Sequence, residues 1–87
     1  MTAAEWAVLR EAVVPGCAVC RSRHTAMLYA AGDFAGVAHR RAKATASGAI
    51  ERFDVLLATS RTERDKARRA LAYHLRTEHD VSLDVTT

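Results

Sequence analysis

Two pairs of potential metal ligands stand far apart in this sequence. Cys17 and Cys20 are separated by two residues, and His74 and His79 are separated by four residues near the other end of the chain. Zinc favours four sulfur and nitrogen ligands in a tetrahedron, and both spacings occur in pairs that bind one ion. These four residues therefore predict one structural zinc ion per chain, which would close a loop of about 60 residues.

The length of the chain makes such a cross-link useful. With 87 residues, the sequence predicts one zinc-binding helical domain over 1–87. Eighteen residues are alanine, which favours helix but buries little area, and Trp6 is the one tryptophan. A domain of this size with a thin core commonly needs a metal, a disulfide or a partner for stability.

Helical spacing of the apolar residues predicts a small all-α bundle of about four helices. The first helix is expected over about 2–13, with Pro15-Gly16 ending it. Ser22 can cap a short second helix, with Leu28 among its inward-facing residues. Gly32-Asp33 is expected to stop this second helix.

The second half of the chain continues the helical pattern. Asp33 can cap a third helix that runs to about residue 58, and Ser47-Gly48 is expected to kink or split it. A capping box that begins at Ser60 predicts the start of the last helix. Residues 80–87 alternate in part like a strand but have no partner strand, so we expect a loosely ordered tail or a docked extension.

The two histidines need a particular helix end to reach one ion. On an ideal helix, positions five apart diverge by about 140°. The last helix must therefore unwind near His79, where helix ends loosen most readily. His24, four residues after Cys20, could replace His79 as a ligand, whereas His39 is expected on a solvated face.

Two other interpretations of the cysteines stay open. They could be small buried hydrophobic residues, with His74 satisfied in the core and His79 on the surface. They could also form a redox pair, since a Cys-x-x-Cys at a helix start can lower a thiol pKa. The redox interpretation usually requires a βαβ pattern, which this sequence does not contain.

The run from His74 to His79, together with the Cys-x-x-Cys, resembles Cys2His2 zinc fingers. A typical finger has about twelve residues between its second cysteine and first histidine, whereas this chain has 53 and lacks the hairpin before the helix. The resemblance therefore implies an atypical finger with a long helical insertion, and it implies the ligand set without any DNA-reading positions. The chain is also similar to small uncharacterised zinc-binding proteins of actinobacteria and their phages, which implies a bacterial or phage origin.

Arginine is the dominant charged residue and suggests a nucleic-acid surface. The chain has a formal net charge of +3, with eleven arginines and two lysines. Such side chains can neutralise phosphates, although interleaved acids make ordinary helix ion pairs equally compatible with the pattern. The candidate contacts to nucleic acid or to a protein partner are Arg40, Arg41, Arg61, Arg64, Arg68 and Arg69.

No catalytic arrangement is recognisable, so we expect a protein that is not an enzyme. The sequence has no phosphate-binding loop and no nucleophile motif, and four protein ligands would leave a zinc ion without an open position. It also has no apolar run that could span a membrane and no signal-peptide pattern, which predicts a cytoplasmic protein. The favoured function is a zinc-stabilised protein-interaction module, and alanine-rich helix faces would also permit a homodimer. The alternative is a nucleic-acid-binding regulator.

Overall fold

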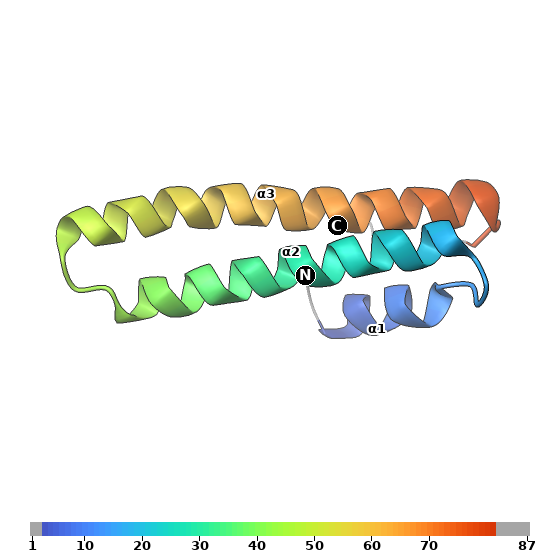
Figure 1. The fold of residues 1–87 in the computed structure, drawn as a ribbon, viewed down its shortest axis with the longest axis horizontal. Helices are drawn as coiled ribbons and strands as arrows, with labels where there is room; N and C mark the ends of the chain where they lie inside the picture. Colours follow the sequence, from blue (N-terminus) through green and yellow to red (C-terminus); the bar gives the residue numbers. More distant parts are fainter. Residues whose placement is uncertain (1–2, 82–87) are drawn as a thin grey trace.

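The computed structural model describes residues 3–81, and this part of the chain forms three α-helices (Figure 1). They are α1 (Ala3–Ala12), α2 (Ala18–Lys43) and α3 (Ser47–Glu78). The predicted all-α class is confirmed, whereas the expected number of about four helices is wrong. None of the described helices is long and apolar enough to cross a membrane.

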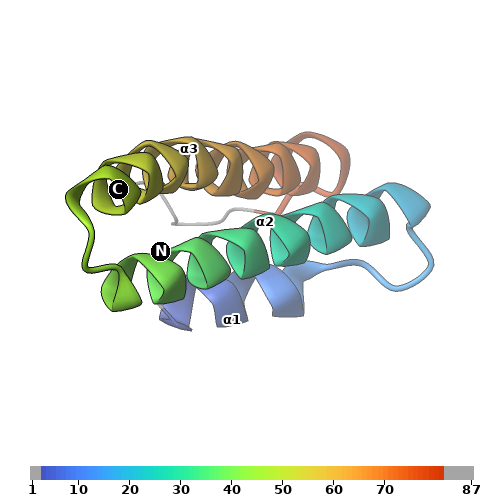
Figure 2. The same ribbon diagram turned by 60° about the vertical axis from the view of Figure 1, so that its left-hand side comes forward.

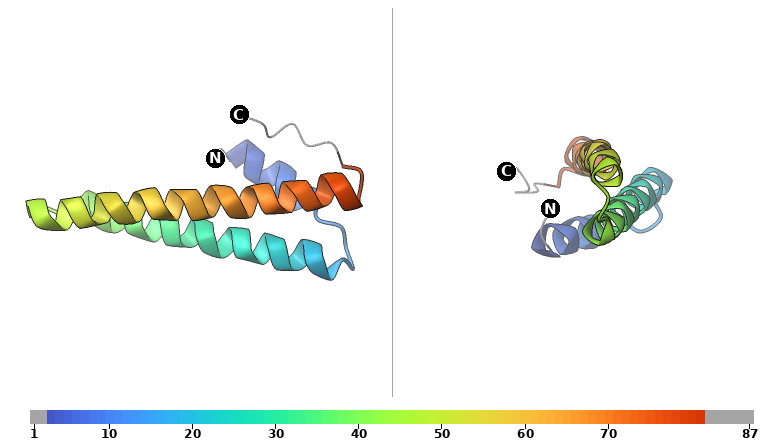
Figure 3. Two further views of the ribbon diagram at one scale, coloured as in Figure 1. Left: turned by 90° about the horizontal axis from the view of Figure 1, so that it is seen from above. Right: turned by 90° about the vertical axis from the view of Figure 1, so that its left-hand side faces the viewer.

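The architecture is a long antiparallel hairpin with a short third helix at one end. The helices α2 and α3, of 26 and 32 residues, run side by side and are joined by residues 44–46 (Figures 1 and 3). Helix α1 lies at the open end of the hairpin, beside the start of α2 and the end of α3, and its closest contacts are with α3. Among the described residues, the half of the hairpin nearest the connection therefore has no third helix (Figures 1 and 2). The molecule measures 48 × 24 × 17 Å, which is elongated for its size.

The two long helices contact each other along a seam with coiled-coil spacing. Buried and half-buried residues recur every three or four positions on both helices, as knobs-into-holes packing requires. On α2 the residues in this spacing are Cys20, His24, Met27, Ala31, Phe34, Ala38 and Arg41, and Val37 next to Ala38 is buried as well. On α3 they are Ile50, Phe53, Leu57, Ser60, Arg64, Ala67, Leu71 and His74.

The core is thin, as expected, and it sits at the open end of the hairpin. Leu9, Cys20, Met27, Leu71 and Leu75 form one cluster and are completely buried. They bring together α1, the start of α2 and the end of α3. The potential metal ligands therefore lie beside the best-packed part of the molecule.

The expected helix boundaries inside the hairpin are wrong, because both long helices continue through their predicted ends. Gly32-Asp33 does not stop α2, since one glycine costs a helix only about 1 kcal/mol relative to alanine and packing of the seam can offset it. Ser60 does not start a helix either. Its hydroxyl donates to the Leu56 carbonyl at 2.7 Å, and the Thr62 hydroxyl donates to the Ala58 carbonyl. Both hydroxyls therefore have hydrogen-bond partners inside α3.

The predictions for the ends of the chain have different outcomes. The first helix occupies Ala3–Ala12, close to the expected range of 2–13. The predicted split near Ser47-Gly48 is confirmed, because α2 ends at Lys43 and α3 begins at Ser47. The tail prediction concerns 80–87, most of which lies outside the described residues.

Candidate metal centre

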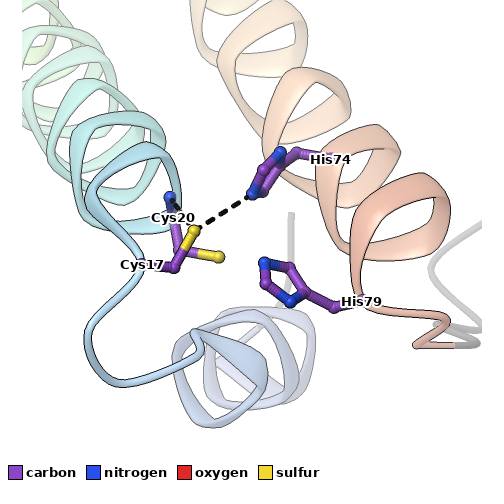
Figure 4. A group of neighbouring side chains, drawn as sticks. All are labelled: Cys17, Cys20, His74 and His79. Atoms are coloured by element: carbon purple, nitrogen blue, oxygen red, sulfur yellow. Dashed lines mark hydrogen bonds between the residues drawn. The ribbon is translucent and has the colours of Figure 1, made fainter.

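The turn before α2 brings the two cysteines onto one helical turn. Gly16 has a φ of +86°, a left-handed conformation that suits glycine because it has no Cβ. The chain then enters α2 with Cys17 as its N-cap, and the Cys17 sulfur accepts a hydrogen bond from the backbone N–H of Cys20 at 3.4 Å. Both thiols consequently lie at the N-terminal end of α2 (Figure 4).

The end of α3 unwinds where the histidine spacing required it. The helix stops at Glu78, and the backbone of His79 has φ −123° and ψ 4°. Asp80 has a φ of +52°, a conformation that aspartate tolerates better than most residues. The Val81 N–H then bonds the Leu75 carbonyl at 3.1 Å and fixes the turn. This confirms the prediction that the helix loosens at His79.

The four predicted ligands converge on one point. One potential ligand atom from each of Cys17, Cys20, His74 and His79 lies within 4.8 Å of the other three. The Cys17 sulfur is 3.5 Å from Nε2 of His74. In a zinc tetrahedron, bond lengths of about 2.3 Å to sulfur and 2.0 Å to nitrogen place such atoms about 3.5 Å apart. The spacing is therefore compatible with a single zinc site.

The orientation and burial of the side chains also suit a metal. The imidazoles meet nearly edge to face, with centroids 5.0 Å apart and planes at 76°, and both rings point toward the sulfurs (Figure 4). Nε2 of His79 is buried and has no hydrogen-bond partner among the described residues. A buried nitrogen without a partner is costly unless something supplies one, and a bound cation would do so.

The environment of the two thiols differs. The pKa of Cys17 is lowered from 9.0 to about 6, chiefly because its thiolate accepts the Cys20 backbone N–H and then because His74 and His79 can donate to it. The pKa of Cys20 is raised, mainly because burial disfavours its charged form. At neutral pH one potential ligand is thus already a thiolate, and the other would have to lose a proton for a metal to bind.

This difference predicts how zinc affinity depends on pH. Between about pH 7 and 8, binding should release close to one thiol proton, from Cys20, so the logarithm of the association constant should rise by about one per pH unit. Below the lowered pKa of Cys17, near 6, protons compete at that ligand as well, and the slope should steepen. Competition with a calibrated chelator at several pH values measures the slope. A slope of two at pH 7–8 would contradict the assignment of Cys17 as the ionised thiol.

The other histidines lie outside this group. His39 is exposed, as predicted. His24 is not one of the four residues whose ligand atoms converge, so the geometry favours His79 over it. Nε2 of His24 is nevertheless buried without a hydrogen-bond partner among the described residues.

The six predicted arginine contacts divide into two kinds. Arg41 pairs with Asp54 at 2.7 Å, and Arg68 lies 3.7 Å from Glu5, which ties α3 to α1. The Arg64 guanidinium stacks over the Phe34 ring at 4.4 Å, with its side chain 15% exposed. These three side chains help to hold the helices together. The exposed members of the set are Arg40, Arg61 and Arg69.

The structure also contains a surface feature that the sequence analysis missed. A shallow groove of about 380 Å³ lies on α2 and is lined by Thr25, Leu28, Tyr29, Gly32 and Asp33. Leu28 was expected to face inward, yet it is 48% exposed. The sequence signal that could have indicated the groove is the pair Leu28-Tyr29 one turn before a glycine inside a helix.

Comparisons with known proteins found no similar protein. No protein-family model, no curated protein and no solved structure matches the chain.

Proposed function

We propose that the chain binds one structural zinc ion through Cys17, Cys20, His74 and His79. The convergence of four ligand atoms within 4.8 Å, from residues far apart in the sequence, is the observation that supports this proposal. Two sulfurs and two nitrogens are a common structural zinc set, and four protein ligands leave no coordination position for a substrate. The ion would stabilise the fold, and the protein would not be an enzyme.

The energetic role of the ion follows from where the ligands lie. Zinc would join the start of α2 to the end of α3 and close a loop of about 60 residues. In the chain-entropy picture such a cross-link stabilises a fold by about 4 kcal/mol. That is comparable to the whole stability of a small domain, so the metal would decide whether this thin-cored hairpin stays folded.

On this basis, the protein would act as a zinc-stabilised protein-interaction module, such as a small adaptor, regulator or phage-encoded inhibitor. A rigid helical hairpin presents large exposed apolar side chains, including Tyr29 at 74% and Val55 at 68% exposure. Nucleic-acid binding has less support, because Arg41, Arg64 and Arg68 are engaged within the chain. A salt titration separates the two, since phosphate binding weakens steeply with salt and an apolar interface does not.

The zinc proposal is tested by the metal content of protein purified without added metal. Elemental analysis by mass spectrometry should find one zinc per chain, and replacing the zinc with cobalt should give the visible absorption of a tetrahedral site with thiolate ligands. His74→Ala and His79→Ala should both reduce the zinc content, because each removes a ligand. His24→Ala and His39→Ala are the matched controls and should retain one zinc. A folded wild-type protein without metal would overturn the proposal.

A further inference from the structure

The four proposed ligands are divided by element between the two sides of the metal centre. Cys17 and Cys20 lie at the start of α2, whereas His74 lies in α3 and His79 is the C-cap residue of that helix (Figure 4). Both sulfurs therefore come from one helix end and both nitrogens from the other. A reaction that joins the two sulfurs to each other would remove both thiolates from the site and leave α2 with no link to α3 through a metal ion.

The two sulfurs are placed where they can form such a bond. Cys17 is the N-cap of α2, and its carbonyl accepts the Arg21 N–H at 3.2 Å, so the first helical turn begins at this residue. Cα atoms three residues apart on a helix are separated by about 5 Å, inside the range of about 4.4–6.8 Å that disulfides span. The two Sγ atoms lie within 4.8 Å of each other. A local rotation of the two side chains can therefore join them while the helices stay in place.

The two thiols differ in their access to solvent, and this difference sets an order of reaction. Cys17 is half-buried and follows the Pro15-Gly16 turn, whereas Cys20 is completely buried. A small oxidant thus reaches the Cys17 sulfur first. This sulfur also accepts the Cys20 backbone N–H at the N-terminal end of a 26-residue helix, a position that favours the thiolate, which is the form that peroxides attack. Cys20 is the second thiol that completes a disulfide after such an attack.

We propose that the site is also a peroxide-sensitive switch, in which a Cys17–Cys20 disulfide replaces the metal link, an inference that rests on the proposed zinc site. One oxygen of hydrogen peroxide bonds to the Cys17 thiolate sulfur as the O–O bond breaks, and the hydroxide that leaves takes up a proton. The Cys20 thiolate then attacks the sulfur of this sulfenic acid, so that the S–S bond forms and a second hydroxide leaves and is protonated. The two sulfurs lose two electrons in all, and the peroxide is reduced to two waters.

Oxidation would remove the cross-link that stabilises the hairpin. A disulfide from Cys17 to Cys20 closes a loop of only four residues, whereas the proposed metal link closes about 60, and the stabilisation from a cross-link grows with the loop that it closes. Two imidazoles without thiolates are a weak zinc site, so the ion would be released. The thin core at the open end of the hairpin would then hold the three helices together without help from a metal.

Hydrogen peroxide added to the zinc-loaded full chain tests the switch. The intact chain should become lighter by two hydrogen atoms, with the disulfide inside the tryptic peptide 11–21. A chromogenic chelator should detect one zinc released per disulfide, at least tenfold faster than without peroxide, and most of the helical circular dichroism should be lost. A dithiol reductant with added zinc should restore it. A 1,3-dione that traps sulfenic acids, present during the reaction, should label Cys17.

Met27→Leu is the matched control. Methionine is the other side chain that peroxide oxidises, and Met27 is completely buried in the same core cluster as Cys20. Leucine conserves the volume of methionine and resists oxidation, so the variant should stay folded and should release its zinc at the wild-type rate. A Met27→Leu chain that keeps its zinc in peroxide would assign the release to methionine and overturn the switch.

The remaining outcomes separate this inference from the zinc proposal. A zinc-loaded wild-type chain that keeps its ion in peroxide, or that forms disulfides only between two chains, would overturn the switch and leave the zinc site intact. A dione label on Cys20 in place of Cys17 would overturn the order of attack. A chain that holds no zinc before peroxide is added would contradict the zinc proposal itself, whichever disulfide forms afterwards.

Discussion

Cys20→Ser is expected to abolish zinc binding and, with it, most of the helix content of the chain. Cys20 would supply one of the four proposed ligands and is also completely buried in the core. A serine hydroxyl is a poor zinc ligand, and the three remaining groups would hold the ion weakly. The lost cross-link corresponds to about 4 kcal/mol, which a domain of this size can hardly lose and stay folded. Far-ultraviolet circular dichroism with and without added zinc measures the effect.

Two controls separate metal loss from the cost of the substitution itself. Val19→Ser introduces the same residue on the same turn at a position 44% exposed, and it should change the free energy of unfolding by less than about 0.5 kcal/mol. A strong chelator added to wild-type protein removes the ion without any mutation and should cause the same loss of helix. A chelated wild-type protein with an unchanged melting curve would show that the fold does not depend on metal.

Leu71→Ala should be the most destabilising change outside the four proposed metal ligands. Leu71 is completely buried between the helices, and truncating such a residue costs about 2–5 kcal/mol through lost burial and the cavity left behind. Urea denaturation in excess zinc, with Leu56→Ala as the control at a position 48% exposed, measures the difference. A cost of less than 1 kcal/mol at Leu71 would mean that the core is not where the structure places it.

The candidate site could be predicted from the sequence because its chemistry is local to two short motifs. The spacing of Cys17 and Cys20 and that of His74 and His79 each restrict the geometry strongly. Even the loosened end of α3 at His79 followed from the angular step of a helix. The all-α class followed in the same way from apolar spacing and alanine content.

The helix boundaries could not be predicted because the residues that mark a helix end, such as serine and glycine, also occur inside long helices. A serine such as Ser60 can cap a new helix or bond back to the preceding turn, and the choice depends on whether the neighbouring helix continues alongside. Gly32 can end a helix or be carried within one when the seam on both sides is packed. The groove was missed for a related reason, since Leu28 reads as a core residue until the position of α3 is known.

The irregular end of α3 sets the order in which a bound ion would be released. Cys20 and His74 lie within the long helices, and the Cys17 sulfur is tied to the Cys20 backbone N–H. His79, in contrast, is the C-cap residue of α3, and its Nε2 has no hydrogen-bond partner among the described residues. Fraying of a helix end is a local opening with a small free-energy cost, far below that of global unfolding. His79 would therefore detach first and leave a three-coordinate ion with one open position. The site would then exchange its metal ion by the detachment and return of His79 alone, while the hairpin of α2 and α3 stays folded.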